Sequence, residues 1–100
     1  MERTYEARIC WLPAEKGGRK ILPEGNLYAP IVSLLPKICE SENCWSLFVR
    51  DIQEIEPRIT LARISYLSSH APNNLSEGVV FYLFEGKRLV ATGLILREII

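Results

Sequence analysis

The chain has 100 residues, of which 48% are hydrophobic and 24% charged, and its 12 basic side chains balance its 12 acidic ones. This composition predicts one globular domain over residues 1–100 and excludes a disordered chain. A neutral protein has no overall field that would draw it to nucleic acid or to an acidic membrane. The charged, alternating start and the lack of a long apolar run predict neither a signal peptide nor a membrane span, so we expect a cytoplasmic protein.

The first half of the chain predicts strands on either side of one long loop. Apolar side chains alternate along residues 4–12, the period-two pattern of a half-buried strand. Residues 12–30 are rich in glycine and proline and predict a loop. Residues 30–38 are strand-like, although Pro36 indicates an edge or a bulge. A polar turn then leads into residues 44–52, which predict the returning strand of a hairpin.

The second half predicts three more strands. Residues 58–67 form the first, a turn-rich connector follows, and residues 79–96 contain two strands joined by a tight hairpin at residues 85–87. Gly93 lies inside the last strand and predicts a bulge or a close backbone approach. About six strands without an amphipathic helix favour closure into a small barrel, because no helix is present to cover a sheet edge.

Two segments carry a family resemblance. Residues 12–30 contain a leucine, an acidic–basic stretch, Gly-Gly-Arg, a long turn and Tyr-x-Pro, at Leu12, Glu15, Gly17, Gly18, Arg19, Tyr28 and Pro30. The end of the chain carries a closing hairpin pattern at Glu77, Gly78, Phe81, Glu85, Gly86, Arg88, Val90 and Gly93. With this order and spacing, nearly the whole chain resembles the third, C-terminal β-barrel domain of elongation factor Tu and related translation GTPases.

The resemblance implies an all-β fold, a six-stranded antiparallel closed barrel, and contacts with a sister domain, partner factors and transfer RNA. It also fits an Arg19 that reaches a carboxylate or a backbone carbonyl, and a Tyr28 ring across the barrel mouth with its hydroxyl bonded. Nucleotide hydrolysis is not implied, because the sequence has no phosphate-binding glycine loop. The sequence departs from the family pattern at residues 56–58, where a Pro-Gly-Asp turn is replaced, and at residues 31–38, which lack aromatic side chains.

Four basic residues form a candidate patch for RNA phosphates: Arg19, Lys20, Lys87 and Arg88. Tyr28 is a candidate stacking neighbour for a base. The alternative is ordinary surface charge on a loop and a hairpin tip, which the neutral composition favours.

No residue set predicts an enzyme, a metal site or a bound cofactor. One histidine, His70, and three scattered cysteines do not supply the four ligands of a structural zinc site. The odd number of cysteines without a CxxC spacing predicts no disulfide framework, and we expect a protein with free thiols. Cys39 and Cys44 nevertheless flank a turn and are expected to lie close enough to bridge under oxidation.

Three carboxylates, Asp51, Glu54 and Glu56, are the other candidates for catalysis. We expect them in a polar connector between strands and exposed to solvent. No apolar surroundings would raise their pKa values, so they predict no acid–base role.

Residues 79–84, VVFYLF, are apolar on both faces of a predicted strand. With Phe81 pointing inwards, Val80, Tyr82 and Phe84 point outwards and need a cover, either a partner protein, a second copy or the loop at residues 12–30. We therefore predict a non-enzymatic module that binds another protein or itself, and the family resemblance implies a connection with translation. The alternatives are an RNA- or tRNA-binding accessory protein and an immunity-type protein that neutralises a toxin.

Overall fold

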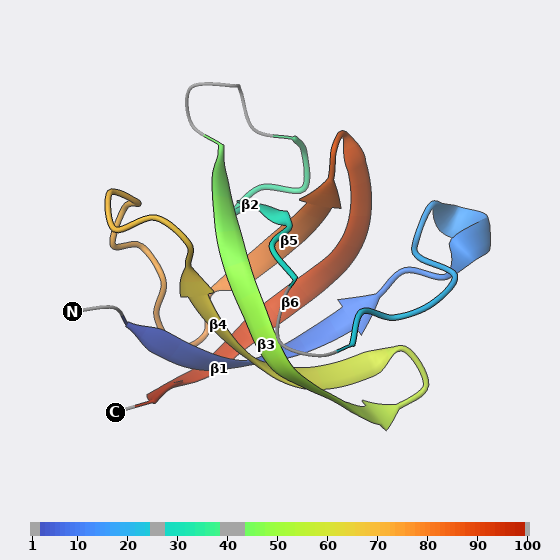
Figure 1. The fold of residues 1–100 in the computed structure, drawn as a ribbon, viewed down its shortest axis with the longest axis horizontal. Helices are drawn as coiled ribbons and strands as arrows, with labels where there is room; N and C mark the ends of the chain where they lie inside the picture. Colours follow the sequence, from blue (N-terminus) through green and yellow to red (C-terminus); the bar gives the residue numbers. More distant parts are fainter. Residues whose placement is uncertain (1–2, 25–27, 39–43, 100) are drawn as a thin grey trace.

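A computed structural model describes residues 3–24, 28–38 and 44–99 and has an all-β fold (Figure 1). The six strands are β1 (Thr4–Trp11), β2 (Ile31–Ser33), β3 (Trp45–Glu56), β4 (Ile59–Tyr66), β5 (Val80–Glu85) and β6 (Arg88–Ile99). The only helical element in the described part of the chain is η1, a single 3-10 turn at Ala14–Lys16. No helix formed by these residues has the length and apolar character needed to cross a membrane.

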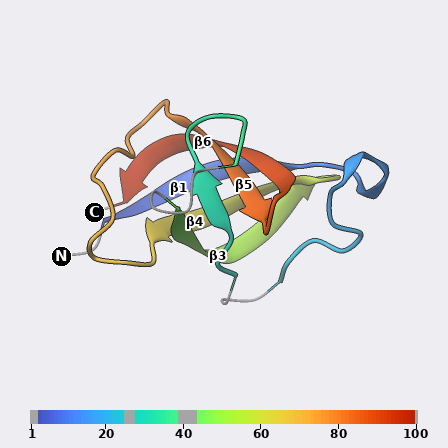
Figure 2. The same cartoon turned by 90° about the horizontal axis from the view of Figure 1, so that it is seen from above.

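The six strands are antiparallel and belong to one sheet, as the sequence predicted. Each strand pairs with two neighbours in the order β1-β4-β3-β2-β5-β6, and β6 pairs back with β1. The sheet therefore forms a ring, which can be followed from two directions (Figures 1 and 2). The predicted hairpins between β2 and β3 and between β5 and β6 are both present as antiparallel pairs.

The hydrophobic core consists of side chains on alternate positions of the strands, because successive residues of a strand point to opposite faces. In β1 the buried side chains are those of Tyr5, Ala7, Ile9 and Trp11. The largest apolar side chains with less than 2% exposure are Ile9, Leu47, Val49, Ile64, Phe81, Leu83, Val90 and Ile95. Burial of one such side chain contributes about 1.5–3 kcal/mol to stability, so these residues together are the main stabilising group of the fold.

Gly93 allows the closest contact in the core. Phe81 and Gly93 are directly opposite each other on β5 and β6, and Phe81 is completely buried. A Cβ atom on Gly93 would lie 2.1 Å from Cζ of Phe81, well inside contact distance. The prediction that Phe81 points inwards is confirmed. At Gly93 the close approach is made by the Phe81 ring and not by a backbone segment, so the predicted bulge or backbone approach is replaced by a side-chain contact.

Two predicted boundaries are wrong. β2 ends at Ser33, so most of the strand predicted at residues 30–38 is a series of bends. The hydroxyl Oγ of Ser33 accepts a hydrogen bond from the backbone N–H of Leu35 at 3.1 Å, and Pro36 has no N–H to donate, so the ladder stops. The second wrong boundary is the end of β3. Asp51, Glu54 and Glu56 lie within this strand rather than in a connector, although they are exposed as expected.

Candidate functional site

The loop after β1 is held by backbone contacts that only glycine permits. Gly17 has a φ of 92°, in the left-handed region that disfavours other residues. Gly18 lies so close to the preceding chain that a Cβ atom would be 1.8 Å from the carbonyl oxygen of Leu12. The Gly-Gly pair therefore closes the turn after η1 and brings Arg19 back towards the ring.

Glu85, the last residue of β5, accepts hydrogen bonds from three side chains that are far apart in the sequence. Oε2 accepts from Arg19 Nη1 and from the Tyr28 hydroxyl, each at 2.5 Å, and Oε1 accepts from Arg88 Nη2 at 3.1 Å. The expected contacts of Arg19 with a carboxylate and of the Tyr28 hydroxyl are thus present. We call Glu85 and these three residues the Glu85 cluster.

Tyr28 is fixed within this cluster on several sides. Its backbone carbonyl accepts from the N–H of Val49 at 2.8 Å. The guanidinium of Arg19 lies 5.4 Å from its ring centroid, and the Trp11 ring lies 5.7 Å away at 52°. Because Arg19 and Trp11 already contact the ring, Tyr28 is poorly placed to stack on a nucleic acid base.

The cluster shifts the pKa values of its members. Partial burial alone would raise the pKa of Glu85, but the hydrogen bonds from Tyr28 and Arg19 outweigh burial and lower it. The hydrogen bond to Glu85 raises the pKa of Arg19. Burial, with the bond to Glu85, raises the pKa of Tyr28 strongly. The arrangement holds a charged carboxylate between cations and a neutral phenol, which suits a structural contact better than proton transfer at neutral pH.

Arg58 is a further anchor of the loop, and the sequence reasoning missed it. It lies at the β3–β4 hairpin with a φ of 65°. Its Nη1 donates to the carbonyl oxygens of Arg19 at 2.5 Å and Leu12 at 3.1 Å. The turn at residues 56–58, where the sequence departs from the family pattern, thus connects the β3–β4 hairpin to the loop. The three residue types alone did not indicate this contact.

The five residues of the predicted RNA patch lie near one another, at the loop and at the β5–β6 hairpin. Arg19 and Arg88 contact Glu85, while Lys20 and Lys87 are exposed. One carboxylate offsets part of the charge of the two arginines, so the lysines are the cations most accessible to phosphate. Whether this patch binds RNA stays a prediction.

The predicted outward strip on β5 is only partly correct. Val80 is 47% exposed and Tyr82 is partly exposed, but Phe84 is only 3% exposed. Leu83 belongs to the core cluster and Phe84 does not, so the chain covers Phe84 separately from the core. A register shift in the β5–β6 pairing next to Phe84 accompanies this burial, and Ile31 of β2 lies opposite on the other side.

A different set of apolar residues extends the exposed part of this strip. Ser33, the last residue of β2, pairs with Tyr82. The next two residues, Leu34 and Leu35, are 36% and 57% exposed. The antiparallel pairing of β2 with β5 runs from Ile31–Phe84 to Ser33–Tyr82, so the chain leaves β2 on the side where β5 begins at Val80. We define Leu34, Leu35, Val80 and Tyr82 as the β2–β5 patch. The leucines were missed because they were assigned to a longer strand.

The other candidates do not form a site. His70 is exposed in the connector after β4, whose Asn73 contacts Arg3. Cys10 follows Arg3 by seven residues, which places it roughly 20 Å from Arg3 at the rise of an extended strand. The connector that carries His70 is therefore far from the Cys10 thiol. Within the described residues, no three His, Cys, Asp or Glu side chains form a group that could hold a metal ion.

The cysteines differ from the expectation of free thiols. Cys10 is free, whereas Cys44 is disulfide-bonded. Cys39 lies outside the described residues, so the predicted Cys39–Cys44 bridge stays a prediction.

Neither a scan against models of protein families nor a search of curated proteins found a match for this chain. The resemblance to the elongation factor Tu domain therefore also stays a prediction, based on residues 12–30 and 77–93.

Proposed function

We propose that this chain is a non-enzymatic binding module that contacts another protein through the β2–β5 patch. The observation that carries the proposal is the exposure of apolar side chains on two segments that the Ser33–Tyr82 pairing joins. Leu35 and Val80 expose about half of their surface, and Tyr82 adds an aromatic ring with a polar end. Tyrosine is enriched at the centres of protein interfaces. Burial of each apolar side chain there contributes on the order of 1–3 kcal/mol.

We also propose that the ring of strands is a closed barrel of the elongation factor Tu domain 3 type. The support is that the residues of the sequence resemblance meet in space: the Gly-Gly turn presents Arg19, and Arg19 and Tyr28 both contact Glu85. Gly93 likewise lies against Phe81. In that family the domain lies against a sister domain and partner factors, which agrees with an exposed contact surface on this chain.

The test compares a patch variant with a control variant that loses an exposed apolar side chain elsewhere on the ring. The patch variant carries Leu35→Ser and Val80→Ser, and the control carries Ile55→Ser on β3, a residue that is 46% exposed near the opposite hairpin. Tagged proteins are used for affinity purification from the source cell, and self-association is measured by sedimentation velocity. We expect a partner, or a dimer, that the wild type and the control retain and the patch variant loses.

The melting temperature of each variant is the fold control for this experiment. All mutated side chains are substantially exposed, so we expect shifts of only a few degrees. Equal recovery of every partner by the wild type and the patch variant, with no change in association state, would contradict the proposed surface.

A further inference from the structure

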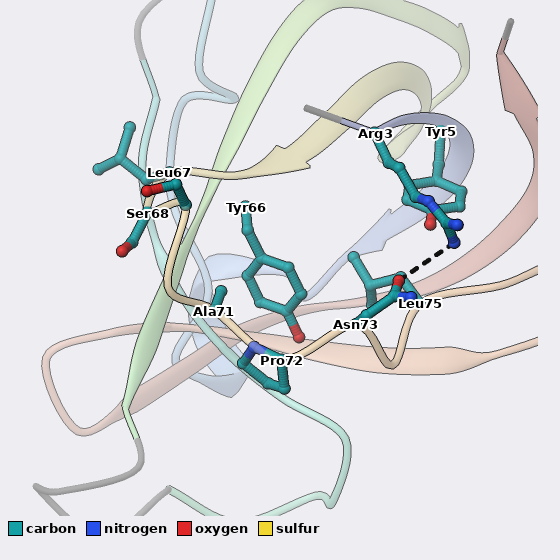
Figure 3. Close-up of a pocket in the computed structure, with 10 residues that line it drawn as sticks. Arg3, Tyr5, Tyr66, Leu67, Ser68, Ala71, Pro72, Asn73 and Leu75 are labelled. Carbon is teal, nitrogen blue, oxygen red and sulfur yellow. Dashed lines mark hydrogen bonds between the residues drawn. The ribbon is translucent and has the colours of Figure 1, made fainter. Parts of the chain in front are cut away.

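The structure contains a pocket of about 450 Å³ (Figure 3). It lies between the start of β1, the end of β4 and the connector that follows β4. The lining residues are Arg3, Tyr5, Tyr66, Leu67, Ser68, Ser69, Ala71, Pro72, Asn73 and Leu75. This volume is within the range of small-molecule sites, and the lining combines apolar side chains with a few polar groups.

The floor of the pocket contains a polar group without a partner. Tyr5 is only 3% exposed, and its hydroxyl makes no hydrogen bond with any of the described residues. A hydroxyl that is buried without a partner destabilises the folded chain, whereas one that opens into a pocket can bond a ligand. Tyr66, by contrast, already donates its hydroxyl hydrogen to Asn74 Oδ1 at 2.6 Å.

Two further polar side chains of the pocket, Arg3 and Asn73, also offer donors. Arg3 uses one nitrogen, Nη1, to donate to Asn73 Oδ1 at 3.1 Å, and its Nε forms an exposed ion pair with Glu98 Oε2 at 3.8 Å, which is beyond hydrogen-bond distance. Its remaining N–H groups are therefore available. The Asn73 side chain, whose oxygen accepts from Arg3, keeps its own amide hydrogens for a further acceptor.

Donors from Tyr5, Arg3 and Asn73 thus line one pocket, together with an apolar wall of Leu67, Ala71, Pro72 and Leu75 and the Tyr66 ring. We propose that this pocket binds a carboxylic acid with a small apolar or aromatic body. The carboxylate accepts hydrogen bonds from the Tyr5 hydroxyl and the Arg3 guanidinium, and the body lies against Tyr66. This site is separate from the β2–β5 patch and does not depend on its role.

A free organic acid and the carboxyl terminus of a peptide present the same chemistry, so the test uses a probe for each. The probes are phenylacetate and N-acetyl-glycyl-phenylalanine, and the neutral control is phenylacetamide, which has the same shape as phenylacetate. Each is titrated into the full chain labelled with nitrogen-15, and backbone amide shifts are followed. We expect saturable shifts at residues 66–75 with at least one acid and affinity at least fivefold weaker for the amide.

Two variants and one control assign the binding to the pocket. Tyr5→Phe removes only the hydroxyl, and Arg3→Gln removes the cation; each is expected to weaken the acid about five- to tenfold. Arg63→Gln is the matched control, since Arg63 is 55% exposed with a carboxylate of Asp51 at 3.7 Å, against 56% and 3.8 Å for Arg3. We expect Arg63→Gln to bind as the wild type does.

The probe that binds more tightly identifies the source of the carboxylate. Absence of saturable binding by both acids, equal binding of the amide, or unchanged affinity in Arg3→Gln would overturn the proposal. Because Arg3 is exposed at the start of β1, this last variant keeps the test decisive even if Tyr5→Phe unfolds.

Discussion

Removal of the Glu85 carboxylate should release the loop at residues 12–24 from the end of the ring. In Glu85→Ala, Arg19 and Tyr28 lose the acceptor that they share, and the Tyr28 hydroxyl is left partly buried without its partner. Glu85→Gln keeps an acceptor oxygen but removes the charge. We therefore expect a graded loss of stability, larger for alanine than for glutamine.

The size of the effect follows from the exposure of the three contacts. A hydrogen bond to a charged group contributes about 1.5–3 kcal/mol when buried. The side chains of Glu85 and Arg19 are 24% and 31% exposed, so solvent reduces each inner bond to about 1 kcal/mol. Arg88 is 53% exposed and adds close to nothing. We expect Glu85→Ala to lower the free energy of unfolding by about 2 kcal/mol and Glu85→Gln by about 1 kcal/mol.

Urea denaturation at several pH values measures this loss and checks its origin. The cluster lowers the pKa of Glu85 from its ordinary value of 4.5. Its stabilising effect is therefore fully present above about pH 4.5 and is lost as the pH falls through the lower pKa of the folded state. The difference between the wild type and Glu85→Gln should shrink in that acid range, while Glu56→Gln, an exposed control on β3, should unfold as the wild type does at neutral pH. A Glu85→Ala variant within about 0.5 kcal/mol of the wild type would refute the reasoning.

Three further predictions concern the core, the lysines and the cysteines. Gly93→Ala should destabilise the fold by about 1–3 kcal/mol in urea titrations, because its Cβ atom meets the Phe81 ring. Addition of Phe81→Leu should then cost less than it does in the wild type, and strictly additive losses would argue against the contact. If RNA binds, replacement of Lys20 or Lys87 by glutamine should lower the log–log salt slope of affinity by about 0.7–0.9 each in filter-binding assays, whereas binding that is insensitive to salt would exclude phosphate contacts. Since Cys44 is disulfide-bonded, thiol titration in denaturant should give one reactive group without reductant and three after reduction. Three reactive groups without reductant would show that the purified protein contains no disulfide.

Much of the fold could be predicted from local patterns. The alternation in β1 indicated its buried face, and the turn at residues 85–87 indicated the hairpin of β5 and β6. The pairing of Phe81 with Gly93 was not predicted, because it follows a register shift between Leu83 and Phe84. Phe84 could not be assigned in this way, because alternation gives the face of a strand but not whether other parts of the chain cover that face. The end of β2 was also missed, since Ser33 stops the ladder through one side-chain hydrogen bond.

The candidate sites were less accessible to sequence reasoning than the strands. Arg19 and Tyr28 were recognised through the resemblance, but the contact of Arg58 with the loop depends on a positive φ in a residue that usually avoids it. The pocket around Tyr5 depends on the path of the connector after β4, and no periodic pattern encodes such a path.

Hydrogen–deuterium exchange of the chain with and without its partner is the most direct test of the β2–β5 patch as a protein-binding surface. The partner is the protein recovered by the wild type and lost by the patch variant, or the second copy in a dimer. We expect slower exchange at residues 31–35 and 80–82 in the complex and unchanged exchange in η1 and at the β5–β6 hairpin. Protection confined to the Glu85 cluster and its loop, with none at residues 31–35 and 80–82, would contradict the account.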